Sequence, residues 1–146
     1  MRKIIAITDR MDVVESWLKN KETIKAIYHL NEVHGQIQGG ILFDDGTMLV
    51  DTHYQDCCEN VYAHWEYLAD EIGIYDTDFS HLKIEEIDKR KNRCGIRICG
   101  NRKFYVPCYN EQNGYYDDRL NIYFIDINKR IVLGSWENVP VIDDID

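Results

Sequence analysis

The stretch that decides the fold reads Gly40-Ile41-Leu42-Phe43-Asp44-Asp45-Gly46-Thr47-Met48-Leu49-Val50. Two apolar runs flank an Asp-Asp-Gly tripeptide, which is a strong turn signal, because Asp and Gly favour the backbone conformations of tight turns. The pattern therefore predicts a β-hairpin. We expect its second strand to run on toward Tyr54 and to enter a cysteine-rich stretch.

The residues before the hairpin predict a strand, a helix and another strand. Residues Lys3–Thr8 are typical of a short strand, and Asp9 is placed to cap a helix over about Arg10–Lys19. Apolar and mostly polar residues alternate over Thr23–Leu30, which indicates a strand, although Ile27 breaks the alternation.

The residues after the hairpin predict one helix followed by a meander. A helix over Val61–Ile72, ended by Gly73, fits the spacing of the apolar side chains. The predicted strands of the meander are Leu82–Ile87, Gly95–Cys99, Lys103–Tyr109, Leu120–Ile127 and Arg130–Trp136. The sequence therefore predicts an α+β fold, in which one or two helices pack on a single twisted, mostly antiparallel sheet.

Length and composition are those of one ordinary domain. The chain has 146 residues, of which 45% are hydrophobic and 29% charged, as in globular proteins. No linker divides it, so we expect a single domain over residues 1–146, with a mobile acidic tail from about residue 141. No segment is apolar enough to cross a bilayer, and the first apolar run is too short for a signal peptide, so we expect a cytoplasmic protein with no membrane partner.

The net charge argues against conventional nucleic-acid binding. The chain carries 26 acidic and 17 basic residues, a formal net charge of −9. An anionic surface repels phosphate backbones, whereas it keeps a protein soluble and suits a basic partner or mimicry of nucleic acid.

The cysteine content predicts free thiols or metal ligands. Five cysteines are present, an odd number, and the cytosol keeps thiols reduced, which disfavours a disulfide framework. They are Cys57, Cys58, Cys94, Cys99 and Cys108.

The stretch His53-Tyr54-Gln55-Asp56-Cys57-Cys58-Glu59 concentrates chemically active side chains. One interpretation is a zinc site, in which His53 and Cys57 supply nitrogen and sulfur ligands and a later cysteine completes the shell. The absence of a C-x-x-C pair makes this spacing unspecific. A structural interpretation is also open: one cysteine of the pair is a small buried side chain, and Asp56 or Asn60 caps the helix predicted to follow.

A third interpretation of the same stretch is a thiol enzyme. A cysteine nucleophile needs a neighbouring base and a group that orients the base. The start of the helix predicted to follow could lower the thiol pKa, whereas the neighbouring carboxylates would raise it. The candidate nucleophiles are Cys57 and Cys58, the candidate bases His53 and His64, and the candidate orienting residues Asp56 and Glu59.

A second candidate region lies between two predicted strands, over residues 110–119. Its Asn113-Gly114 pair predicts a turn, and two tyrosines beside two aspartates are typical of a contact surface, because tyrosine covers area with little loss of entropy. The alternative is that these tyrosines fold back onto the sheet. Together with the first stretch, the predicted binding residues are Asn113, Tyr115, Tyr116, Asp117, Asp118, Gln55, Asp56 and Glu59.

Four strings of residues resemble a family of small phage and prophage proteins. They are T-I-K-A-I from Thr23, D-D-G-T from Asp44, H-Y-Q-D-C-C-E-N-V from His53 and N-G-Y-Y from Asn113. The resemblance covers roughly Thr23 to Ile125. The family is a domain of unknown function, so the resemblance implies a mobile-element origin and a fold, but no activity.

The function predicted from these features is binding without catalysis. A small acidic phage-type protein with no complete catalytic motif fits an agent that engages a host protein or a small ligand, for instance as an inhibitor of host defence. No cofactor is expected. The alternative is a zinc ion bound by His53 and Cys57. The alternative is a thiol- or zinc-dependent enzyme, or a structural metal site, centred on residues 53–59.

Overall fold

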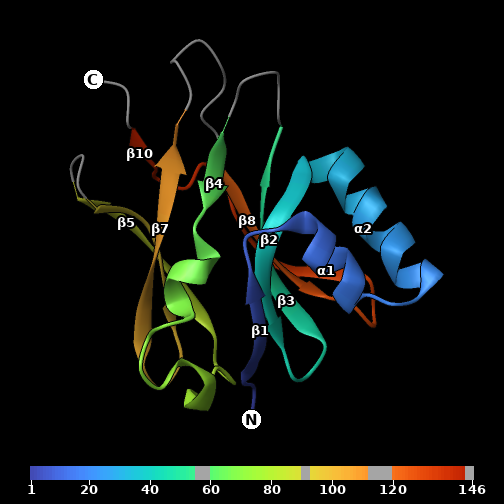
Figure 1. Ribbon diagram of the computed structural model, residues 1–146, viewed down its shortest axis with the longest axis horizontal. Coiled ribbons are helices and arrows are strands. Elements are labelled where there is room, and N and C mark those ends of the chain that lie inside the picture. The colour runs from blue at the N-terminus through green and yellow to red at the C-terminus, as the bar shows by residue number, and fades with distance from the viewer. Residues whose placement is uncertain (55–59, 90–92, 112–119, 144–146) are drawn as a thin grey trace.

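The chain folds into three layers: two helices, a first sheet and a second sheet (Figure 1). The computed structural model describes residues 1–54, 60–89, 93–111 and 120–143, with the backbone alone at 31–34 and 143. The helices cover one face of the first sheet, and the second sheet packs against its other face.

The first sheet is antiparallel and has the strand order β1-β2-β3-β8-β9. Its strands are β1 (Ile4–Thr8), β2 (Gln36–Phe43), β3 (Thr47–His53), β8 (Asn121–Asp126) and β9 (Ile131–Trp136). The predicted hairpin is confirmed as β2 and β3. At its turn Gly46 has a φ of +82°, and the Asp45 carboxylate accepts hydrogen bonds from the Thr47 amide (3.1 Å) and hydroxyl (2.6 Å).

The second sheet is built around β7. Its antiparallel meander consists of β5 (Lys83–Lys89), β6 (Arg93–Cys99) and β7 (Lys103–Asn110). The short strand β4 (Val61–Ala63) pairs antiparallel with the end of β7, and β10 (Ile142–Asp143) pairs parallel with it. All five predicted strands of the meander are therefore present as β5 to β9.

The predicted α+β class is confirmed, but the prediction of a single sheet is wrong. Two sheets form because β3 pairs with β8, for example Leu49 with Phe124. This pairing removes the last two strands of the predicted meander and adds them to the hairpin. The partner of β3 lies far along the chain, so the local sequence pattern carries no signal for it.

The two helices are α1 (Met11–Trp17) and α2 (Lys21–His34). The first confirms the predicted helix, but Asp9 does not cap it: Arg10 stands at its N-cap, with no side-chain cap. The second replaces the predicted strand over Thr23–Leu30. Asn20 caps α2 by accepting a hydrogen bond from the Thr23 amide (2.8 Å). Ile27, the residue that broke the predicted alternation, is buried where α2 packs on the first sheet.

The helix predicted over Val61–Ile72 is also wrong. The chain forms β4 and the 3₁₀ turn η1 (Trp65–Leu68) there. Gly73, in the left-handed region (φ +80°), then precedes a second 3₁₀ turn, η2 (Ile74–Asp76). Carboxylates from distant segments bind the backbone of this stretch. Asp51 accepts a hydrogen bond from the Ala63 amide (2.9 Å), and Asp9 accepts one from the Glu66 amide (2.9 Å).

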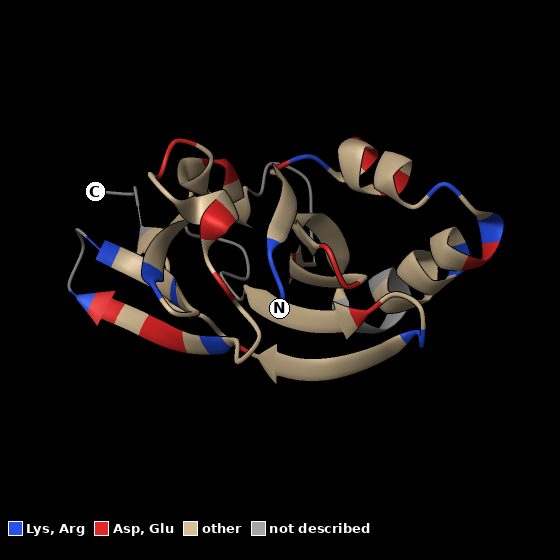
Figure 2. Cartoon of the chain, turned by 90° about the horizontal axis from the view of Figure 1, so that it is seen from below, with Lys and Arg blue, Asp and Glu red and all other residues tan. Residues whose placement is uncertain are grey.

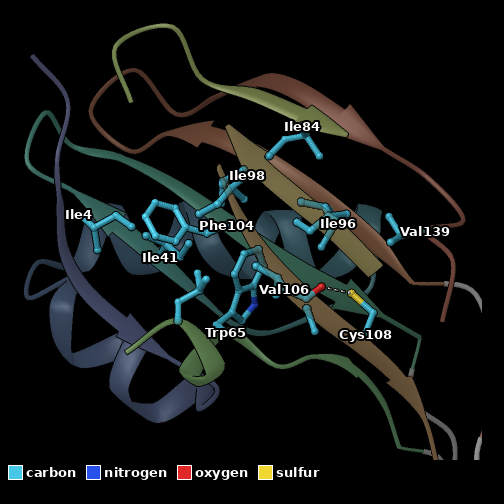
Figure 3. Packing of buried hydrophobic residues seen from close by; sticks show 14 of the residues in the cluster. Ile4, Ile41, Trp65, Ile84, Ile96, Ile98, Phe104, Val106, Cys108 and Val139 are labelled. Carbon is cyan, nitrogen blue, oxygen red and sulfur yellow. Dashed lines mark hydrogen bonds between the residues drawn. The ribbon is translucent and has the colours of Figure 1, made fainter. Parts of the chain in front are cut away.

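The core has two parts, one on each face of the first sheet. Every residue of β3 is buried, and successive side chains point to opposite faces. Leu49 contributes to the cluster between the two sheets, part of which Figure 3 shows, whereas Met48 and Val50 contribute to the cluster under the helices. In the described part of the chain, no helix has the length and apolarity to cross a membrane.

Candidate functional site

Most of the predicted site residues lie outside the described part of the chain. His53 is described: it ends β3 and is buried (1% exposed). The remaining predictions therefore stay predictions. They concern Gln55, Asp56, Cys57, Cys58 and Glu59 in the first stretch, and Asn113, Tyr115, Tyr116, Asp117 and Asp118 in the second.

The fold places the borders of these two regions next to each other. Asn60 follows the first stretch and Glu111 precedes residues 112–119. The Glu111 amide donates to the Asn60 carbonyl (2.8 Å), and the Asn60 side-chain amide donates to the Glu111 carboxylate (2.7 Å). The end of the first region and the start of the second thus border residues that lie side by side, where β4 pairs with β7.

The three described cysteines are buried thiols. Cys94, Cys99 and Cys108 are at most 5% exposed, and burial raises the pKa of each. Cys108 lies within the core between the sheets and contacts the Val106 carbonyl (Figure 3). Among the described residues, no group of three or more His, Cys, Asp or Glu side chains is arranged to hold a metal ion.

Alkylation of the folded protein tests the thiol hypothesis. We expect iodoacetamide to modify Cys94, Cys99 and Cys108 about a hundredfold more slowly than in denaturant, because a buried, protonated thiol must first be exposed. Peptide mass spectrometry after a short pulse gives the rate for each cysteine. A thiol enzyme further requires that Cys57 or Cys58 react faster than a free thiol, and an ordinary rate at both would contradict it.

The described residues contain one extended group of surface aromatic rings, here called the tyrosine face: Tyr62, His64, Tyr67, Tyr105 and Tyr109. It covers the outer side of the second sheet. On β7 the side chains of Phe104, Val106 and Cys108 point into the core, so Tyr105 and Tyr109 point outward. Tyr62 on β4 stands directly opposite Tyr109 in the strand register.

The rings of the tyrosine face form an unbroken series of contacts. The centroid distances are 5.6 Å for Tyr62–Tyr109, 6.4 Å for Tyr109–His64, 6.2 Å for His64–Tyr67 and 6.1 Å for Tyr67–Tyr105. The last contact is edge-to-face, and such pairs are favourable beyond the area they bury. The Arg93 guanidinium lies over the Tyr105 ring at 4.6 Å and extends the series.

Hydrogen bonds fix the polar ends of these side chains. The Tyr62 hydroxyl donates to the Glu111 carboxylate (3.0 Å), and burial, followed by this contact, raises the pKa of Tyr62. The Tyr105 hydroxyl donates to the Cys94 carbonyl (2.7 Å), and burial raises its pKa to about 12. Both phenols therefore stay protonated at neutral pH, and the rings are held in place.

An Asp–His pair lies within the tyrosine face. The His64 Nδ1 atom and the Asp9 carboxylate are 2.7 Å apart, and the imidazole is about one-third exposed (37%). This arrangement orients a histidine as in many hydrolases, but a hydrolase also needs a nucleophile on the other ring nitrogen. Among the described residues, no Ser, Thr or Cys side chain hydrogen-bonds to His64, and the candidate nucleophiles Cys57 and Cys58 lie outside the described part of the chain.

A buried carboxylate supports the tyrosine face from inside. Asp51, on β3, is fully buried between the sheets and accepts four hydrogen bonds. The donors are the Trp65 indole (2.8 Å), the Ala63 amide (2.9 Å), the Gln38 side chain (2.9 Å) and the Gly39 amide (3.1 Å). Two of these donors flank His64, so Asp51 positions the segment that carries Tyr62, His64 and Tyr67.

The environment of Asp51 has opposing effects on its ionisation. Burial raises its pKa from 3.8 to about 6, whereas the hydrogen bonds from Ala63, Trp65 and Gln38 lower it. All four partners donate hydrogen bonds. They therefore suit the ionised carboxylate, whose two oxygens only accept. Asp51 is therefore charged at neutral pH and joins β2, β3, β4 and η1.

Neither the tyrosine face nor the role of Asp51 was predicted from the sequence. A signal was present for each. Tyr105 and Tyr109 alternate with apolar residues along a predicted strand, which places them on its outer side. Asp51 extends an apolar run, Met48-Leu49-Val50, which is where a carboxylate is least expected unless it has buried partners.

Comparisons with known proteins leave the family of this chain open. No protein-family model, no curated protein and no solved structure matches it. The resemblance to phage and prophage proteins therefore stays a prediction, and function has to be argued from the tyrosine face and its surroundings.

Proposed function

We propose that this chain is a small acidic binding protein of phage or prophage type that acts without catalysis and engages a partner protein of the host through the tyrosine face. The observation that carries the proposal is the continuous series of partly exposed aromatic rings from Tyr62 to Tyr105. Tyrosine and arginine are enriched in protein interfaces and in their energetic centres, and Arg93 lies on this series.

The rings are already ordered in the free protein, which favours binding. Tyr62 and Tyr105 are held by hydroxyl hydrogen bonds, and His64 is held by Asp9. Ordering side chains on association costs free energy, so preformed contacts lower that cost. A partner would meet an aromatic centre whose rim carries charges, among them the Glu85 carboxylate, which contacts both Arg97 (3.0 Å) and Lys103 (3.2 Å).

Two described residues that border the predicted binding regions lie next to each other. Asn60, which follows residues 55–59, and Glu111, which precedes residues 112–119, are hydrogen-bonded at the Tyr62 end of the tyrosine face. The predicted binding residues Tyr115 and Tyr116 belong to the second of these regions. This adjacency supports one composite surface. Inhibition of a host defence protein is the role that we would examine first.

Affinity capture with matched tyrosine variants tests the proposal. The face variant is Tyr67→Ala/Tyr109→Ala, and its control is Tyr28→Ala/Tyr75→Ala, which removes two tyrosines that are 52% and 46% exposed elsewhere. We expect the wild type and the control to capture the same host protein, and the face variant to bind it about 30-fold or more weakly, as for loss of an energetic centre. Isothermal titration with the purified partner gives the affinities.

Two outcomes decide the extent of the surface. Equal capture by the face variant and its control contradicts the proposal. A Tyr115→Ala/Tyr116→Ala variant tests the contribution of the neighbouring region, and wild-type affinity in that variant would confine binding to the described rings. Circular dichroism of each variant checks that a loss of binding is not a loss of folding.

A further inference from the structure

A second surface lies on the opposite side of the molecule, between α2 and the β8–β9 hairpin. We propose that this corner binds an extended peptide segment that carries aliphatic and acidic side chains and that adds to β9 as a further strand. The inference concerns a different face from the proposed function and does not depend on it. It follows from a hollow, an open strand edge and a cluster of cations that lie together.

The hollow is small and apolar. It has a volume of about 280 Å³. Pockets for drug-sized ligands are about 300 to 1,000 Å³, so this hollow suits one or two aliphatic side chains. Its apolar lining consists of Ala26, Ile27 and Leu30 from α2 and Ile125, Ile127 and Ile131 from the hairpin.

The strand β9 is open beside this hollow. It is the last strand of the first sheet, and in the described part of the chain no strand pairs with the edge that faces away from β8. Ile131, Val132 and Leu133 are 47%, 38% and 48% exposed. Since successive side chains of a strand point to opposite faces, both faces of β9 are open here. An open edge with exposed aliphatic residues is a template for an added strand.

The charge at this corner indicates the chemistry of the occupant. Lys25 and Arg130 line the hollow, Lys21 lies beside it on α2, and Lys129 precedes Arg130 in the turn. Figure 2 shows basic residues at both the α1–α2 connection and the β8–β9 turn, at one end of the molecule. Such a cluster favours a partner segment with carboxylates.

The acidic residues at this corner leave the cations available. The Glu22 carboxylate contacts both Lys25 (3.5 Å) and Arg130 (3.4 Å), and all three side chains are more than half exposed. The second acidic residue, Asp126, accepts a hydrogen bond from the Lys129 amide (3.0 Å). Two cations sharing one carboxylate in exposed pairs can contact a second carboxylate without losing a buried partner.

Labelled heptapeptides test the proposal on the whole chain by fluorescence anisotropy. The probe is Asp-Ile-Asp-Val-Asp-Ile-Asp, and the two controls replace its aspartates by lysines or its aliphatic residues by serine and threonine. We expect the probe to bind at least tenfold more tightly than either control. General attraction to an acidic protein would favour the lysine peptide, so equal or tighter binding of that peptide, or no binding of the probe, overturns the proposal.

Variants and chemical shifts locate the binding. Arg130→Asn removes a cation while tolerating the positive φ (+57°) of this position, and Leu133→Thr removes an exposed aliphatic side chain. We expect each to weaken probe binding about tenfold, whereas Lys83→Gln, which removes an exposed charge from β5, leaves it unchanged. Amide shift changes should concentrate in α2 and β9. Changes in β4 and β7 instead would place the peptide on the tyrosine face and overturn this assignment.

Discussion

Replacement of Asp51 by alanine is expected to lower the free energy of unfolding by about 4 kcal/mol, or to prevent folding. The variant leaves four donors without their acceptor in a fully buried site: the Trp65 indole, the Ala63 and Gly39 amides and the Gln38 side chain. Each unsatisfied buried donor costs about 1 to 3 kcal/mol, and local relaxation with entry of water recovers part of the sum.

Urea denaturation followed by tryptophan fluorescence measures this effect, because Trp65 is itself one of the donors. Asp70→Ala removes an exposed carboxylate and is the matched control, with an expected change of about 0.5 kcal/mol or less. Asp51→Asn keeps the size of the side chain but directs an NH₂ group at other donors, so we expect an intermediate loss. A loss of less than about 1 kcal/mol in Asp51→Ala would show that the four hydrogen bonds do not hold the sheets together.

The second large effect is the contribution of Asp51 to the pH dependence of stability. Its pKa is about 6 in the folded protein and 3.8 for an ordinary aspartate, because burial disfavours the charged form. Between these values the folded protein holds a proton that the unfolded chain has released. Protonation of Asp51 therefore stabilises the folded state, fully below about pH 4, and this stabilisation is lost as the pH rises through about 6. The difference between the two pKa values corresponds to about 3 kcal/mol in the free energy of unfolding.

Comparison with Asp51→Asn isolates this effect. Asp45, Asp78 and Glu85 have lowered pKa values, so their stabilisation is instead lost on acidification, but they are present in both proteins and cancel in the difference. We expect the free energy of unfolding of the wild type, relative to the variant, to be about 2 to 3 kcal/mol higher at pH 4 than at pH 7. If the free energy of unfolding varied with pH in the same way in both proteins, the hydrogen bonds to Asp51 would fully offset the effect of burial on its pKa.

Much of the fold was predictable because many of its elements depend on neighbouring residues. The Asp44-Asp45-Gly46 turn and the strands that became β5 to β9 all follow from local turn residues and short apolar runs. The helix α2 was within reach as well. Alternation over Thr23–Leu30 competed with helical spacing, and the buried Ile27 together with the Asn20 cap shows that the helical pattern was the correct one.

The candidate site was less predictable, because it depends on contacts between distant segments. Tyr62 and Tyr109 meet only because β4 pairs with β7. Val61–Ile72 has apolar spacing that fits a helix, yet Asp51 and Asp9 bind its backbone and favour a strand and a 3₁₀ turn. Neither carboxylate is near this stretch in sequence.

The sequence by itself determined the hairpin at Asp44–Gly46, the strand-rich α+β class and the net charge, since each depends on composition or on residues a few positions apart. Only the tertiary structure decided that two sheets form, that Asp51 joins them, and that the tyrosine face gathers on one side. These features depend on strand partners and on buried hydrogen bonds between remote residues. Their free energy appears only when the layers pack and exclude water, and no local pattern encodes it.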